Sequence, residues 1–155
     1  MSRLDVAAAL AVLLLALAPR PAAALDCAVS GLEGGEARLW RAGVWTPLGP
    51  GPLAAGEAIL ATGPGARVEI RCEGGTTVTV GPETEIALGT LLAPGPGGVT
   101  MQLLRGLVGV VSRLGAGLGF ELRTPLAIAS VRSTAWLAEQ RPGGGAAVFV
   151  REGRV

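Results

Sequence analysis

The residues best suited to chemistry in this chain are an Arg-Ser-Thr triplet and a pair of carboxylates. Arg132, Ser133 and Thr134 adjoin in SVRSTAWLAEQ, and Glu83 and Glu85 stand two apart in GPETEI. The triplet could bind an anion or supply a nucleophile, and two carboxylates could serve glycoside hydrolysis. The sequence has no histidine and no lysine, which removes Ser-His-Asp, Cys-His and Schiff-base arrangements. We therefore interpret the triplet as a corner between strands and the glutamates as a solvated edge, and predict a non-enzymatic protein without a cofactor.

Two cysteines, Cys27 and Cys72, are the other reactive groups. Two thiolates without histidine cannot complete an ordinary structural zinc site, so we predict no metal centre. In an oxidising compartment an even pair favours one disulfide, and two free thiols are the alternative.

The N-terminus has the pattern of a secretory signal over residues 1–24. Arg3 precedes the apolar run Val6–Ala18, and Ala22-Ala23-Ala24 forms a small-residue cleavage site. The run is shorter than the roughly 20 residues that span a bilayer, so an uncleaved anchor is the less favoured alternative. We expect residues 25–155 to be periplasmic or secreted, with no stable membrane anchor after cleavage. Lipid attachment at Cys27 is a minor alternative.

The charge of the predicted exported part excludes one class of partner. Residues 1–24 contain two of the 13 cations and one of the 12 acids, which leaves 11 of each. A balanced charge provides no basic footprint for nucleic acid.

Short β-strands between glycine and proline turns dominate the rest of the chain, which has 25 glycines and 11 prolines. In RVEIRC and TTVTV the apolar residues alternate with polar ones, and Glu73-Gly74-Gly75 between them predicts a hairpin. We predict an all-β fold over residues 25–155, a short-stranded β-solenoid or β-helix-like domain, with a β-sandwich as the alternative. Further strands are predicted at Ala37–Trp40, Ala58–Ala61, Glu85–Leu88, Val99–Leu104, Leu107–Ser112, Phe120–Thr124, Leu126–Val131, Ala135–Glu139 and Ala146–Val150.

The order of these segments resembles the FecR domain, a periplasmic module of bacterial iron-responsive signalling proteins. Four segments support this resemblance, and AVFVREGRV is similar to the ending of the family. They are WTPLGPGPLAAGEAILATGPGARVEI, CEGGTTVTVGPETEIAL, Leu104-Arg105-Gly106 with the apolar run after it, and FELRTPLAIASVRSTAWLAE.

The resemblance implies a structural role for the motif residues, namely Gly74, Gly106, Thr124, Pro125, Arg132, Ser133, Thr134 and Gly153. Ser133 departs from the family, which usually has glycine there. FecR-type regulators also have a cytoplasmic segment, a transmembrane helix and a receptor-contacting region. In this chain the apolar run begins at residue 6 and the last motif ends at Val155. We therefore expect a stand-alone exported FecR domain.

Two functions follow from the resemblance. The first is a protein-binding or signal-transduction module that recognises another envelope protein through strand edges and through Trp40, Trp45 and Trp136. For each tryptophan a place in the core is the favoured alternative to a place in an interface. The alternative is a structural β-solenoid component of an envelope or surface assembly, which self-associates through its strand edges.

Overall fold

The protein is described by a computed structural model that covers residues 25–93, 98–113 and 119–154, with the backbone alone at 133, 134, 153 and 154. The predicted signal peptide at residues 1–24 lies outside these residues. The described residues form twelve strands and two short 3-10 turns and contain no α-helix, so the all-β prediction is confirmed. The strands are β1 (Cys27–Glu33), β2 (Ala37–Arg41), β3 (Val44–Pro47), β4 (Gly51–Leu53), β5 (Ile59–Thr62), β6 (Arg67–Cys72), β7 (Thr76–Val80), β8 (Glu85–Ala87), β9 (Val99–Ser112), β10 (Phe120–Arg123), β11 (Ile128–Gln140) and β12 (Ala146–Arg154), and the turns are η1 (Glu73–Gly75) and η2 (Gly89–Leu91).

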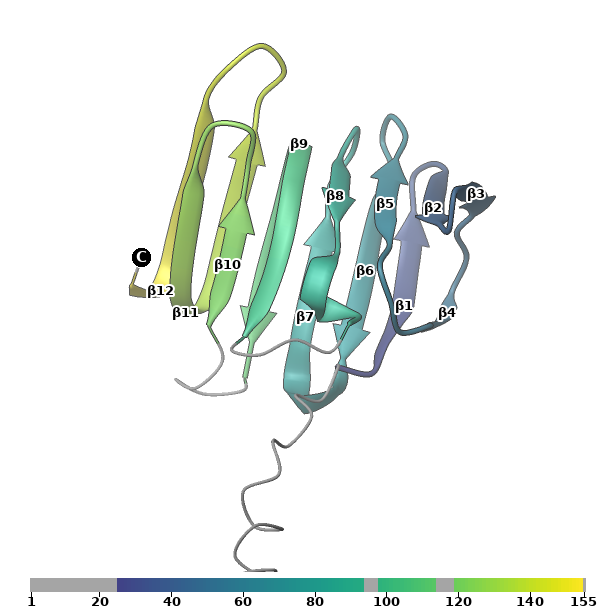
Figure 1. Ribbon diagram of the computed structural model, residues 1–155, viewed down its shortest axis with the longest axis horizontal. Helices are drawn as coiled ribbons and strands as arrows, with labels where there is room; N and C mark the ends of the chain where they lie inside the picture. Colours follow the sequence, from purple (N-terminus) through teal and green to yellow (C-terminus); the bar gives the residue numbers. More distant parts are fainter. Residues whose placement is uncertain (1–24, 94–97, 114–118, 155) are drawn as a thin grey trace, which may run out of the picture.

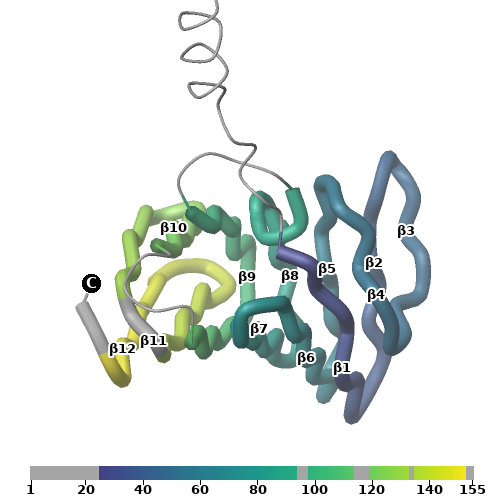
Figure 2. Tube along the Cα trace, turned by 90° about the horizontal axis from the view of Figure 1, so that it is seen from below, coloured from purple at the N-terminus to yellow at the C-terminus, as the bar shows by residue number. Residues whose placement is uncertain are grey.

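The strands form one curled, open sheet whose two halves face each other (Figures 1 and 2). One half, sheet A, has the strand order β4-β1-β6-β7-β9-β11-β12. The other half, sheet B, has the order β3-β2-β5-β8-β9-β10-β11. Strands β9 and β11 therefore belong to both halves and join them along one side.

Two long strands replace four of the predicted short ones. The segments Val99–Leu104 and Leu107–Ser112 are both part of β9, which pairs first with β8 and β10 and then with β7 and β11. The segments Leu126–Val131 and Ala135–Glu139 both contribute to β11. The breaks that the sequence suggested are thus places where a strand changes sheet without ending. The RVEIRC–TTVTV hairpin is confirmed as β6–β7, with Ile70 opposite Val78.

The core lies between the two halves and is built mainly from aliphatic side chains. Alternate residues of β6, β7 and β9, such as Ile70, Val78 and Val110, are fully or almost fully buried from sheet A. Sheet B contributes a matching set, and Phe120 packs edge-on against Trp136 with ring centroids 5.8 Å apart. Because one face of each strand is buried, the pairing register is fixed by the two-residue alternation of apolar side chains.

A disulfide joins Cys27 of β1 to Cys72 of β6, where the two residues are direct partners in the ladder. The predicted pairing is therefore confirmed. None of the elements in the described part of the chain is a helix long and apolar enough to cross a membrane.

Candidate interaction surface

The Arg-Ser-Thr triplet lies inside β11 and is not the turn between strands that its sequence suggests. Residues Ile128–Val131 pair with β10, whereas Ala135–Gln140 pair with β9. The register against β12 is irregular between Ser133 and Trp136, which marks a bulge at this point. Bulges bend a strand locally, and here the bend passes β11 from sheet B to sheet A. The Arg132 side chain is exposed, so the triplet serves as a bend in an extended strand.

Gly106 marks the matching bend in β9 and packs against Thr84. Its φ of 94° is one that side-chain-bearing residues rarely adopt, and a Cβ there would overlap Thr84 Oγ1. The buried Thr84 hydroxyl accepts a hydrogen bond from Leu107 N at 2.9 Å and donates to Pro82 O at 3.0 Å. Thr62 Oγ1 accepts from Thr84 N at 2.9 Å and donates to Gly81 O at 2.6 Å. These hydrogen bonds hold three segments together, namely the end of β5 at Thr62, the turn at residues 81–84 and the bend of β9 at Gly106.

Four other motif residues shape turns or pair within a ladder. Gly74 has a φ of 76° within η1, and Gly153 pairs with Ser133 in the β11–β12 ladder. Thr124 closes the β10–β11 turn, because its Oγ1 accepts from Ala127 N at 3.0 Å and its backbone N donates to Ala127 O at 2.8 Å. Pro125 follows it as an exposed turn residue. These residues therefore shape the backbone. The turn that contains Thr124 and Pro125 also carries the exposed Leu126.

The two candidate carboxylates occupy different settings. Glu85 on β8 forms an ion pair with Arg105 at 3.6 Å. Glu83 is exposed in the turn before β8, where its φ is 49° and its backbone N donates to Gly63 O at 3.2 Å. Neither setting aims a carboxylate into an enclosed apolar site. No group of three His, Cys, Asp or Glu residues in the described segments could hold a metal ion.

The three tryptophans differ in burial. Trp136 is in the core, and its Nε1 has no hydrogen-bond partner among the described residues. Trp40 is half-buried on β2 and lies opposite Trp45 of the edge strand β3. Trp45 is 40% exposed, and the Arg38 guanidinium lies 5.4 Å from its ring centroid. Only Trp40 and Trp45 therefore remain available for contact with a partner.

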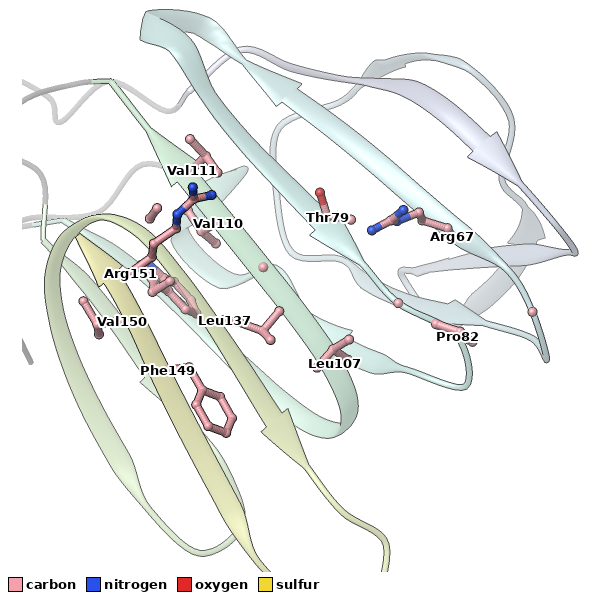
Figure 3. A pocket seen from close by; sticks show the side chains of 15 residues that line it. Arg67, Thr79, Pro82, Leu107, Val110, Val111, Leu137, Phe149, Val150 and Arg151 are labelled. Atoms are coloured by element: carbon pink, nitrogen blue, oxygen red, sulfur yellow. The ribbon is translucent and has the colours of Figure 1, made fainter. Parts of the chain in front are cut away.

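A groove of about 610 Å³ that is largely apolar lies on the outer face of sheet A. Its exposed apolar side chains come from β9, β11 and β12, with Val111 52%, Leu137 38% and Phe149 56% exposed. Figure 3 shows Leu107, Leu137 and Phe149 along one side of the hollow. Thr79 of β7 and Arg67 of β6 line the opposite side. We call this surface the β9 groove.

The β9 groove was not predicted from the sequence. Outward-facing residues of strands are usually polar when a sheet borders solvent. In β9 they are Leu107, Gly109 and Val111, since the intervening Val108 and Val110 are buried. The run LVGVV therefore has apolar residues on both faces, which was a signal for a strand whose outer face is also covered.

Beside the β9 groove, the outer face of β1 and β6 is charged. Glu69 Oε1 accepts hydrogen bonds from Ser30 Oγ at 2.8 Å and from Arg71 Nε at 2.9 Å. The Ser30 hydrogen bond, and to a lesser extent the Arg71 charge, hold the pKa of Glu69 below its usual value. Glu69 and Arg71 thus compensate each other, and the charge of Arg67 on the same face also helps to lower the pKa of Glu69.

The family model for the FecR protein matches residues 58–155 of the chain. The chain belongs to the FecR family. The match spans β5 to β12 and so includes the Thr84–Gly106 junction, the bend of β11 and the whole β9 groove. No curated protein and no solved structure matched the chain.

Membership of the FecR family makes this chain a signal-transduction-related module of the bacterial envelope. The motif residues that carried the resemblance are at the bends and turns of the fold. None of the named motif residues lines the β9 groove, and its outward-facing side chains are free to contact another molecule.

Proposed function

We propose that this protein is a non-enzymatic, exported recognition module that binds another envelope protein through the β9 groove. The observation that carries the proposal is the contiguous exposure of Val111, Leu137 and Phe149 on three neighbouring strands. Exposed apolar patches of this kind mark interaction sites, because their exposure to water costs free energy that a partner recovers.

Export is supported by the Cys27–Cys72 disulfide, since such bonds persist in oxidising compartments. Membership of the FecR family supports a location in the envelope and a role in signalling. A recognition module needs no catalytic group, which agrees with a chain that has no histidine and whose Glu85 is paired with Arg105.

Site-specific photo-crosslinking in the bacterium that produces the protein tests this function. A photoreactive side chain is placed in turn at Leu137 in the β9 groove, at Trp45 in the aromatic edge and at Ile128 beside the β10–β11 turn. Arg71, on the same outer face as the groove but outside it, gives the background. We expect covalent adducts with one envelope protein at Leu137 well above the yield at Arg71. Background yields at all three apolar positions would refute a partner-binding function.

A structural assembly is the second candidate, and the free sheet edges favour it. In the described residues β12 pairs with β11 alone, and β3 and β4 each have one neighbour. Unpaired edges can accept a strand from another molecule. Sedimentation velocity over a wide concentration range decides the matter: assembly requires species larger than a monomer, and a monomer at the highest concentration would rule it out.

A further inference from the structure

Gly109 occupies a position where neither backbone geometry nor crowding requires glycine. It lies within the central strand β9, opposite Thr79 of β7 and Leu137 of β11. Its φ is not among the positive ones, and a Cβ there would meet only Leu137 Cδ1 at 3.4 Å and Trp136 O at 3.9 Å. A glycine inside a strand weakens it, and such glycines often mark a place where a ligand or another backbone approaches closely.

Because Gly109 has no side chain, its backbone forms the floor of the β9 groove. Leu107 and Val111 flank Gly109 along the strand and project from the same face. The hollow is therefore apolar at its centre and open to solvent, with room for a main chain to pass close to the sheet.

Two arginines stand on opposite sides of this floor. Arg67 belongs to β6 and Arg151 to β12, and Figure 3 shows Arg67 beyond Thr79 and Arg151 beside Val110 and Val111. Both are exposed, and neither forms an ion pair within the described residues, whereas Arg71, Arg105, Arg123 and Arg141 each pair with a glutamate. Arg151 is available to a ligand, and Arg67 is available in part, because its charge also acts on Glu69 and Glu33 is its partner in the β1–β6 ladder. The groove thus offers positive charge at two separated points.

The spacing of the two arginines selects the kind of ligand. From β6 to β12 the order is β6-β7-β9-β11-β12, and four strand spacings of about 4.8 Å correspond to about 19 Å. The ladder registers put Arg151 four residues further along the strands than Arg67, about 13 Å, so the backbone positions are about 23 Å apart across the sheet. An extended peptide covers that distance with about seven residues at about 3.3 Å each. A fatty acid or similar amphiphile has an anionic group at one end only and would leave one arginine without a partner.

We propose that the β9 groove binds an extended segment of a partner protein with an apolar centre and an acidic residue at each end. The segment crosses the strands of sheet A, its backbone passes over Gly109, and its carboxylates pair with Arg67 and Arg151. This inference rests on the proposed recognition function and specifies the chemistry of the partner.

A random peptide library displayed on phage, selected on the purified protein with its disulfide intact, tests the proposal. We expect enrichment of peptides with several apolar residues between two Asp or Glu positions. A synthetic copy of an enriched peptide should bind Gly109→Val about tenfold or more weakly than the native protein, because the new side chain fills the hollow. Arg67→Glu and Arg151→Glu should each weaken binding several-fold, and the effect should diminish with added salt.

Gly31→Val is the matched control. Gly31 is on β1 in the same sheet, outside the β9 groove, and a Cβ there would meet only Glu69 Cβ at 3.8 Å. It should bind the peptide as the native protein does, and thermal unfolding should show that both valine variants are folded. Enrichment of neutral or basic peptides, equal binding by Gly109→Val, or no enrichment would overturn the proposal.

The crosslinking experiment separates this inference from the proposed function. Adducts at Trp45 or Ile128 but not at Leu137 would retain a partner-binding function and reject the β9 groove as its site. Adducts at Leu137 that persist in Gly109→Val would likewise reject the role of Gly109.

Discussion

Thr84 and Gly106 are packed so closely that each fixes the conformation of the other. The Thr84 hydroxyl accepts a hydrogen bond from the backbone N of Leu107, directly after Gly106, at 2.9 Å. Gly106 has a φ of 94°, and a side chain on it would collide with Thr84. Since β9 crosses here from one half of the sheet to the other, the pair anchors the strand on which the β9 groove is built.

Replacing Gly106 by alanine should destabilise the protein strongly, whereas the same change at Gly109 should not. The alanine at 106 must adopt a positive φ and displace Thr84, which together cost about 2–4 kcal/mol. At Gly109 a Cβ fits, and alanine should stabilise the strand by about 0.5–1 kcal/mol. Urea unfolding of both variants measures the difference. Equal effects at the two positions would contradict this explanation.

Thr84→Val removes the hydroxyl with little change of shape. Because Thr84 is fully buried, the Leu107 N–H loses its acceptor without gaining water, and we expect a loss of about 1–3 kcal/mol in the free energy of unfolding. Thr46→Val is the control, since Thr46 is exposed and its hydroxyl donates only to Leu39 O at 3.3 Å. A loss at Thr84 no greater than that at Thr46 would show that the junction contributes no stability.

Reduction of the Cys27–Cys72 disulfide should lower the stability without changing the fold. The bond closes a loop with a sequence separation of 45, for which the chain-entropy model gives about 4 kcal/mol. The double variant Cys27→Ala, Cys72→Ala should unfold at lower urea concentration and should be insensitive to reductant. If reductant does not shift the unfolding of the native protein, the bond does not contribute as described.

Trp136→Phe should be far milder than Trp136→Ala. The indole Nε1 has no hydrogen-bond partner in the part of the chain that the structure describes, so its removal costs no hydrogen bond there. Phenylalanine retains a ring that can pack against Phe120, and we expect a loss of about 1–2 kcal/mol against about 3–5 kcal/mol for alanine. Similar losses for both variants in thermal unfolding would point to a hydrogen-bonded indole.

Ser30→Ala should raise the pKa of Glu69 toward its ordinary value. The Ser30 hydroxyl is the main group that lowers this pKa, and Arg71 keeps part of the shift in the variant. A carboxyl whose pKa is lower in the folded state stabilises the fold above the unfolded pKa, and this contribution is lost as the pH falls through the folded value. Side-chain NMR titration of Glu69 measures the pKa directly. An unchanged titration midpoint would exclude the hydrogen bond in solution.

The sequence was informative where one alternating pattern matched one strand, as in β6 and β7. It was less so at Gly106 and at Arg132-Ser133-Thr134, because residues that usually end a strand here bend one that continues in the other half of the sheet. The edge strands β3 and β4 were not predicted, since GVWTPLGPGPL contains as many turn residues as strand residues and its pairing depends on β2 and β1.

The candidate site was harder to predict than the fold. The sequence offered Trp40, Trp45 and Trp136 as contact residues while favouring a core position for each, and only Trp136 is buried in the core. The β9 groove depends on which strands adjoin in sheet A, and its residues come from segments as far apart as Arg67 and Arg151. Residues at such separations become neighbours only through the strand order.

The most direct test of the central claim is the photo-crosslinking yield at Leu137 compared with that at Arg71 in the living bacterium. We predict one envelope protein bound at Leu137, loss of that adduct in Gly109→Val, and its retention in Gly31→Val. An adduct yield at Leu137 no higher than at Arg71 would contradict the claim that the β9 groove is the recognition surface.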